Sequence, residues 1–142
     1  MHAVRHELPL SLEEGSLSSR EATWGPMHVV FQSLPAKWTD AGLFADAPTG
    51  ECPCPHWGYM VRGTMRITYA DHDELVHAGA AYYIPPGHTI RAITDCELVE
   101  FSAEDAYQAA LAIAARTVGA GAGGPAGPPM AAIPEDEAAW VH

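Results

Sequence analysis

Residues 52–63, CPCPHWGYMVRG, and residues 79–88, GAAYYIPPGH, carry the signals that decide the expected fold. In both stretches, β-branched and aromatic residues form short runs that glycine or proline interrupts, at Gly63 and at Pro85-Pro86-Gly87. Runs of this kind are typical of β-strands bounded by turns. Gly63 in particular predicts a tight hairpin or a bulge between its two flanking strands.

The same pattern continues on both sides of these stretches. We expect strands over residues 27–34, 57–62, 64–69, 74–77, 82–84, 89–94 and 97–102. Turn signals at intervals of about eight to twelve residues favour an all-β sandwich or barrel over alternating strands and helices. A chain of 142 residues is long enough for one such domain and leaves little room for a second.

The segments outside the strands complete the expected organisation. We predict an N-terminal arm over residues 1–25, a β-barrel over 26–102, a C-terminal helix over 103–118 and a flexible tail rich in Gly, Pro and Ala over 119–142. The arm is polar and lacks a clear period, so we expect it to be irregular. Ser102 is a candidate N-cap for the helix, whose apolar stripe includes Tyr107 and Leu111.

Charge and hydropathy exclude several classes of partner. The formal net charge is −11 with only seven Lys and Arg, so the chain lacks the basic patch that binding to nucleic acid or to an anionic membrane needs. The sequence contains no apolar run of about 18 residues, the length of a membrane span, and no apolar core of a secretory signal at its start. We therefore expect a cytoplasmic protein.

Three cysteines provide no disulfide framework, and two of them lie close to a histidine. In an extended chain, Cys52, Cys54 and His56 project from one face, with the two cysteine Cα atoms roughly 6.5–7 Å apart, at the edge of disulfide reach. His88 follows the Pro85-Pro86-Gly87 turn and can return to the same end of a barrel. Because thiolate and imidazole are preferred ligands of Zn²⁺ and Fe²⁺, we predict a site for a divalent metal, zinc or iron, at Cys52, Cys54, His56 and His88.

Each of these residues also has a purely structural interpretation. The cysteines could be small buried hydrophobic residues, His56 a hydrogen-bonded core histidine, and His88 a cap of its turn. Cys96 stands alone in a turn, and we expect it to be structural. Glu100 could be a general base if its side chain points inward, but we expect it to point outward into solvent.

The glycine, proline and ligand spacing resembles that of the cupin superfamily. The first cupin motif is G-x5-H-x-H-x3,4-E-x6-G, and Gly63 matches its last glycine. Counting back from Gly63, His56 stands where the family has its glutamate ligand, Cys52 replaces the second histidine, and Gly50 stands at the first histidine.

The second cupin motif, G-x5-P-x-G-x2-H-x3-N, is matched at Gly79, Pro85 and Gly87. The family histidine would fall at Ile90, and His88 lies two residues earlier with the same strand parity. Over residues 27–102 the chain thus resembles a small single-domain cupin with the motifs CPCPHWGY and PPGH. The resemblance implies a single cupin barrel (a double-stranded β-helix, or jelly roll), a bound metal and pairing into a homodimer through sheet edges.

Three functions follow from these features. The first is a metal-binding cupin that acts on a small molecule in the barrel, by resemblance with lyase, isomerase or oxygenase chemistry. The second is a non-catalytic cupin that binds or senses a ligand and holds a structural zinc ion. The third is redox or metal sensing through the paired thiols. A Cys54 that joins the other three residues would close the metal shell and favour the second function, whereas three ligands leave a coordination position open.

Overall fold

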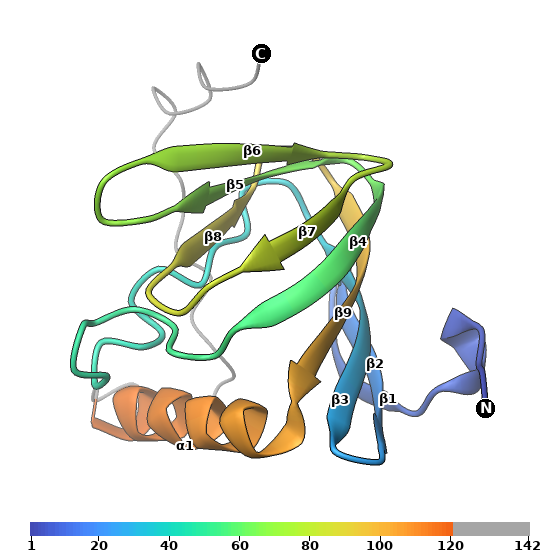
Figure 1. Ribbon diagram of the computed structural model, residues 1–142, viewed down its shortest axis with the longest axis horizontal. Coiled ribbons are helices and arrows are strands. Elements are labelled where there is room, and N and C mark those ends of the chain that lie inside the picture. Colours follow the sequence, from blue (N-terminus) through green and yellow to red (C-terminus); the bar gives the residue numbers. More distant parts are fainter. Residues whose placement is uncertain (121–142) are drawn as a thin grey trace.

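The computed structural model describes residues 1–120, and strands dominate them (Figure 1). A 3-10 helix over Arg5–Glu7 precedes the first strand. The strands are β1 (Leu10–Glu14), β2 (Leu17–Trp24), β3 (Met27–Leu34), β4 (His56–Arg62), β5 (Thr64–Thr68), β6 (Asp73–His77), β7 (Ala81–Ile84), β8 (Thr89–Ala92) and β9 (Cys96–Ala103), and the helix α1 (Glu104–Ala120) follows them. No helix in this part of the chain is long and apolar enough to cross a membrane.

The strands form two antiparallel sheets that pack against each other as a barrel. One sheet has the order β1-β2-β3-β9-β4-β7 and the other the order β6-β5-β8. Helix α1 lies below the sheets, beside the long loop between β3 and β4 (Figure 1). The strand expected over 27–34 is confirmed at its bounds, and the other expected strands are confirmed to within two residues at each end. The prediction of an all-β barrel followed by a C-terminal helix is therefore confirmed.

Gly63 is a corner between the two sheets, and the hairpin expected there is wrong. Strand β4 pairs with β7 and β9, whereas β5 pairs with β6 and β8. Gly63 has a φ of 89°, and a Cβ at this position would overlap the carbonyl oxygen of Asp95. Glycine is required here because the chain passes close to another backbone in a left-handed conformation.

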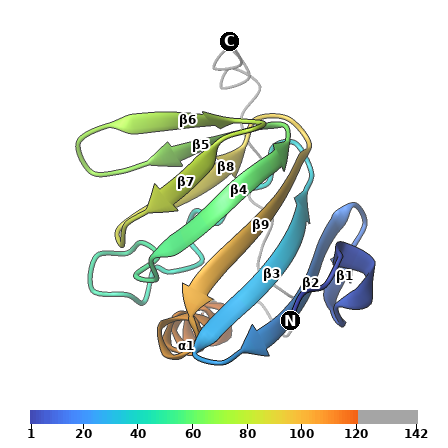
Figure 2. The same cartoon turned by 45° about the vertical axis from the view of Figure 1, so that its right-hand side comes forward.

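The expectation of an irregular N-terminal arm is wrong for residues 10–24. Strand β2 pairs with β3 residue by residue from Ser18 to Trp24, and β1 pairs with β2, so both strands extend the larger sheet (Figure 2). Of β2, only Leu17 and Ser19 are buried. Strand β2 shows no alternation of apolar and polar residues, because backbone pairing with β3 rather than a buried apolar face holds it in the sheet.

Two apolar clusters fill the interior. The main core is built from both sheets and consists of Leu17, Leu34, Met60, Met65, Ile67, Val76, Tyr82, Ile84, Ile90, Ala92, Cys96 and Leu98. A smaller cluster under α1, which we call the helix-side cluster, contains Cys52, Cys54 and Ala110, with Phe44, Ala106 and Tyr107 packed against them. Cys96 is thus a core residue, as its structural interpretation predicted.

The C-terminal boundaries differ slightly from those expected. Ser102 lies inside β9 and not at the start of a helix, and α1 continues to residue 120. The tail expected over 119–142 begins inside α1, and its residues 121–142 lie outside the described part of the chain. Because Ser102 is a buried residue of β9, its hydroxyl can form hydrogen bonds inside the barrel.

Candidate metal centre and adjoining cavity

Cys52, His56 and His88 form a compact group of metal-ligand type. One potential ligand atom from each of the three residues lies within 4.8 Å of the other two, and all three side chains are buried. Backbone pairing brings the two loop residues together, because the Cys52 N–H donates to the His88 carbonyl at 3.2 Å and the Gly87 N–H donates to the Cys52 carbonyl at 2.8 Å. His56 is the first residue of β4 and completes the group from the sheet.

His88 presents an unsatisfied nitrogen inside this group. Its Nδ1 lies 2.7 Å from the Pro85 carbonyl, which can only accept, so Nδ1 carries the proton. Its Nε2 is buried and has no hydrogen-bond partner among the described residues. Burial lowers the pKa of His88 to about 4, so the ring is neutral near pH 7. A neutral imidazole whose other nitrogen donates to a backbone carbonyl is the form in which histidine binds metals.

His56 lies between Cys52 and Ser102. Its Nε2 is 3.8 Å from Cys52 Sγ, and its Nδ1 is 2.7 Å from Ser102 Oγ. Its ring meets that of His88 edge to face at a centroid distance of 5.1 Å. Burial lowers the pKa of His56 to about 4 and raises the pKa of the Cys52 thiol to about 12. Metal binding at this group must therefore displace the thiol proton, while both imidazoles already have the neutral form that ligation needs.

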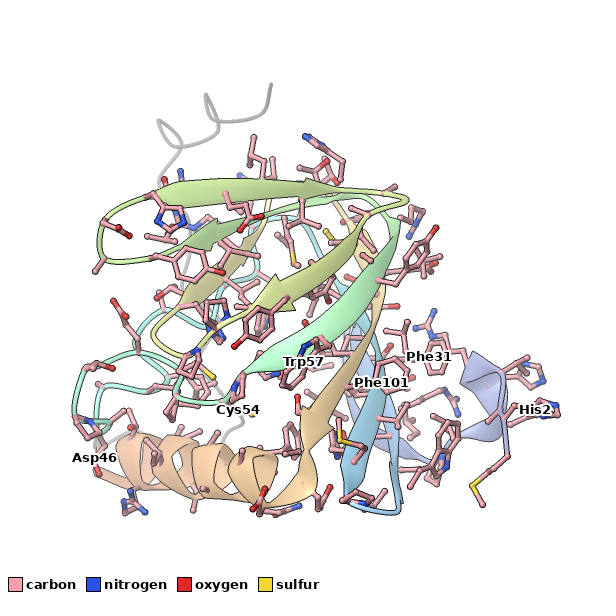
Figure 3. All side chains as sticks on the ribbon, in the orientation of Figure 1. His2, Phe31, Asp46, Cys54, Trp57 and Phe101 are labelled. Atoms are coloured by element: carbon pink, nitrogen blue, oxygen red, sulfur yellow. The ribbon has the colours of Figure 1, made fainter. Side chains whose placement is uncertain are left out.

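Cys54, the fourth predicted ligand, is not brought into the same group. Its thiol lies 3.5 Å from the Pro55 carbonyl, and its side chain is buried in the helix-side cluster above α1 (Figure 3). The shared parity of the two cysteines assumed a strand, but β4 begins only at His56 and Cys52 makes an isolated bridge. Alternation therefore does not apply to the CPCP segment, and Cys54 as a ligand stays a prediction.

Glu100 points into the barrel, so the expectation of an outward, solvated side chain is wrong. The register places Val30, Glu100, Gly58 and Tyr82 in one row across four neighbouring strands. The Tyr82 hydroxyl donates to Glu100 Oε2 at 2.7 Å, and Glu100 Oε1 lies 3.8 Å from His56 Nδ1. Burial raises the pKa of Glu100. Gly58 makes this row possible, since a Cβ there would overlap the Tyr82 ring.

A cavity of about 380 Å³ adjoins the metal-ligand group. Cys52, His56 and Glu100 belong to its lining. The remaining lining comes from β1, β2, β3, β8 and β9, from the loop between β3 and β4, and from α1. It consists of Ser11, Leu12, Leu17, Ser19, Glu21, Val30, Gln32, Trp38, Asp40, Leu43, Phe44, Ile90, Ser102, Tyr107, Ala110 and Leu111. The N-terminal strands that the sequence did not predict are thus one wall of the cavity.

Asp40 is a second buried carboxyl group in the cavity lining, and the sequence did not indicate it. Its Oδ1 accepts the Ile90 N–H at 2.7 Å, and burial raises its pKa to about 7. The loop that carries it lies beside β8, where the Thr39 hydroxyl donates to the Ile90 carbonyl at 2.8 Å. An aspartate between Thr39 and Gly42 has the composition of an ordinary turn, so no sequence signal distinguished it.

The two antiparallel sheets, rolled around one apolar core with a His/Cys group at one end, are a single cupin barrel. Oxalate decarboxylase from Bacillus subtilis has the same fold: its S161A mutant superposes with a TM-score of 0.54 at 20% identity over 70% of this chain, and its structure at pH 4.6 with a TM-score of 0.53 at 21% identity. The present chain spans 28% of the length of those chains. Another structure of that decarboxylase concerns its Mn(II) centres. No protein-family model and no curated protein sequence matches the chain.

Proposed function

We propose that this protein is a metal-binding cupin that binds a small molecule in the cavity and acts on it. The observation that carries the proposal is the buried His88 Nε2, which has no hydrogen-bond partner among the described residues and lies in one group with Cys52 and His56. An unsatisfied buried nitrogen costs on the order of 1–3 kcal/mol, so a ligand that accepts its lone pair would be stabilising. A divalent cation has the chemistry that this donor set accepts.

The proposed ligands are Cys52 Sγ, His56 Nε2 and His88 Nε2. One thiolate and two imidazoles suit zinc or iron(II) better than manganese, which prefers oxygen ligands. Three protein ligands leave one position of a tetrahedral site open. A metal bound there would supply a Lewis acid or activate a bound water. The Mn(II) centres of the structurally similar decarboxylase support a metal-binding function for the fold and do not identify the metal of this chain.

The surrounding residues would perform separate tasks. Ser102 orients the His56 ring through its Nδ1, which leaves Nε2 directed toward Cys52. Tyr82 fixes Glu100 beside His56, where the carboxyl group can hold or accept a proton from a bound molecule. A metal beside a proton acceptor suits lyase, isomerase and oxygenase chemistry, and we propose that the activity belongs to one of these classes.

Metal analysis of single variants tests the proposal. Protein purified without added metal is expected to contain about one zinc or iron per chain, as one tetrahedral site requires. Cys52→Ala, His56→Ala and His88→Ala are expected to lose the metal, while Cys54→Ala keeps it and is the matched cysteine control. Metal-free wild type that also fails to take up added Zn²⁺ or Fe²⁺, with the three alanine variants folding as well as wild type, would refute the metal site.

A second candidate function is a binding or sensing cupin with a closed, structural zinc site. Cys54 favours it, because this thiol is buried with Cys52 in the helix-side cluster and would complete a Cys2His2 set after a local movement. Four-coordinate zinc with two thiolates is typical of structural sites. Loss of zinc and of thermal stability in Cys54→Ala, as in the three other variants, would favour this function over catalysis.

For the assembly we propose a homodimer, and for the location the cytoplasm. Support for the dimer comes from the outer face of the larger sheet, where Trp57 and Tyr83 are 46% and 51% exposed and stack at 5.1 Å. Phe101 is paired with Trp57 on this face, and Figure 3 shows both residues with Phe31 nearby. Exposed apolar patches mark association surfaces. The free, buried cysteines fit a reducing compartment. Sedimentation of wild type and Trp57→Ser tests the dimer, which the substitution is expected to weaken.

A further inference from the structure

The outer face of the smaller sheet carries two arginines directly opposite each other. Arg66 on β5 pairs with Arg91 on β8. Their sequence neighbours Met65 and Ile90 belong to the main core, so alternation along the strands directs both arginines away from it. Opposite residues of an antiparallel pair have Cβ atoms about 5 Å apart. The two guanidinium groups therefore originate from one small area of the surface.

A third cation lies beside this pair. The Lys37 N–H donates to the carbonyl of Ala92, the residue after Arg91, at 2.8 Å. Asp73 Oδ2, 3.9 Å from Arg66 Nε, offsets one of the three charges. We call Lys37, Arg66 and Arg91 the basic face, which holds three of the seven Lys and Arg in a chain of net charge −11. Because like charges opposite each other destabilise a sheet, an anionic group bound here would be stabilising.

The surroundings of the arginines suit an acidic peptide with apolar side chains. Both arginines are half-buried, and ion pairs at partly buried positions are screened less by salt than ion pairs on the open surface. Leu75 on β6 is directly opposite Arg66 and is 39% exposed. A peptide that presents carboxylates together with a large apolar side chain could therefore contact both kinds of group.

The chain itself contains a segment with this chemistry. Residues 134–140 read PEDEAAW, with three consecutive acids at 135–137 and an aromatic residue, Trp140, three positions further on. Residues 121–142 contain no lysine or arginine. The charge of this segment is thus complementary to that of the basic face.

The segment is also connected to the barrel by a sufficient length of chain. Helix α1 ends at Ala120 and lies at the opposite end of the barrel from β5 and β6 (Figures 1 and 2). Residues 121–134 can span up to about 50 Å when extended, whereas a domain of this size has a diameter of about 35 Å. The sequence of residues 121–129, GAGGPAGPP, has the composition of a spacer.

We propose that residues 134–140 dock on the basic face of the same chain. The carboxylates of residues 135–137 pair with Arg66, Arg91 and Lys37, and Trp140 contacts Leu75. This intramolecular contact covers the outer face of the smaller sheet. It involves none of the three proposed metal ligands, so the inference does not depend on the proposed function.

Hydrogen–deuterium exchange of the full chain, read by mass spectrometry over residues 131–142, tests the docking. Exchange in wild type at low salt is expected to be roughly tenfold slower than in the double variant Arg66→Gln/Arg91→Gln, because a docked segment exchanges only after it opens. About 1 M NaCl, at which the Debye length is about 3 Å, should reduce the difference. Arg62→Gln is the control, since this exposed arginine at the end of β4 lies beside Glu97. Equal exchange in wild type and the double variant would overturn the inference.

Changes in the acidic segment keep the test decisive if the arginine variants do not fold, which exchange of the strands in the same data reveals. Glu135→Gln/Asp136→Asn/Glu137→Gln changes no residue of the barrel and is expected to accelerate exchange over residues 138–142 as much as the arginine variant does. Unchanged exchange there in this variant would contradict the docking.

Two further arms identify the partner of the basic face. Glu135→Lys/Asp136→Lys/Glu137→Lys should lose the protection, and combination with Arg66→Glu/Arg91→Glu should restore it, as direct pairing requires. Failure of this charge exchange in a folded protein would refute the pairing. Protection in wild type that disappears on dilution would show that the docked segment belongs to a second copy, which would refute docking within one chain.

Discussion

The main core and the helix-side cluster are both buried, but they differ in what surrounds them. The main core joins the two sheets with large, fully buried apolar side chains such as Met60, Met65 and Ile67. The helix-side cluster is small, contains two thiols, and borders His56 and Glu100. The comparison indicates that stability is concentrated where the interior is purely apolar. Chemistry is concentrated where buried polar groups lie next to a cavity.

The largest effect is expected in the main core. Met65 on β5 is fully buried between Val76 and Ala92 on the neighbouring strands. Met65→Ala should lower the free energy of unfolding by about 2–5 kcal/mol, through lost burial and a residual cavity. Chemical denaturation measures this change. Metal content per folded chain is expected to stay at the wild-type level, and a loss of metal would contradict the separation of the two regions.

Gly58 lies at the border between the two regions. Gly58→Ala adds a methyl group that would overlap the Tyr82 ring, so we expect a loss of about 1–3 kcal/mol of stability from overpacking. Because Tyr82 positions Glu100, ligand binding in the cavity should weaken as well. Gly119→Ala in α1 is the matched control, since open space surrounds that position. Equal stability of both variants in thermal melts would show that Tyr82 does not need the space at Gly58.

Ser102→Ala should change the metal affinity of the site without a matching loss in the free energy of unfolding. Removing the hydroxyl that holds His56 Nδ1 is expected to reduce metal affinity roughly 10–100-fold, the usual effect of losing an orienting hydrogen bond of a ligand. Competition with a chelator measures the affinity of Ser102→Ala, and the exposed Ser16→Ala is the control. Unchanged affinity would show that Ser102 has only a packing role.

The most gradual effect is a pH dependence caused by Asp40, because it is spread over the range from about pH 4 to 7. Its pKa is raised by burial from 3.8 to about 7, so between these values the folded chain binds more protons than the unfolded chain. The contribution of Asp40 to stability is therefore full below about pH 4 and decreases as the pH rises to 7, by at most about 1.4 kcal/mol per pH unit. Stability of Asp40→Asn should therefore lack this decrease, whereas Glu74→Gln should show it as wild type does. Parallel stability profiles of wild type and Asp40→Asn from pH 4 to 8 would contradict the assignment.

The barrel fold could be predicted from the sequence because glycine and proline mark the places where its strands end. Gly63 and Pro85-Pro86-Gly87 stand where the chain leaves one strand for another, and the runs between them alternate as strands do. Which strands pair could not be predicted, because β4 and β5 are adjacent in sequence but belong to different sheets. Strands β1 and β2 were missed because their polar residues carry no alternation, and their pairing with β3 is a long-range property.

For the site, the sequence identified the ligand types but not the full surroundings. Cys52, His56 and His88 are brought together as their residue types and spacing suggested, whereas Cys54 lies outside this group because its segment is not a strand. The inward direction of Glu100 depends on the register of β9 between two partner strands. The position of Asp40 in the cavity lining depends on the loop between β3 and β4, which lies beside β8. Neither of these arrangements leaves a local pattern in the sequence.

Cobalt substitution tests the metal centre most directly. A Co²⁺ ion bound by a thiolate produces a charge-transfer absorption in the near ultraviolet, and tetrahedral geometry produces strong visible bands. Wild type and Cys54→Ser are expected to show both, whereas Cys52→Ser loses the charge-transfer band and His88→Ala loses Co²⁺ affinity. A charge-transfer band that persists in Cys52→Ser, or no Co²⁺ spectrum in folded wild type, would contradict a centre built from Cys52, His56 and His88.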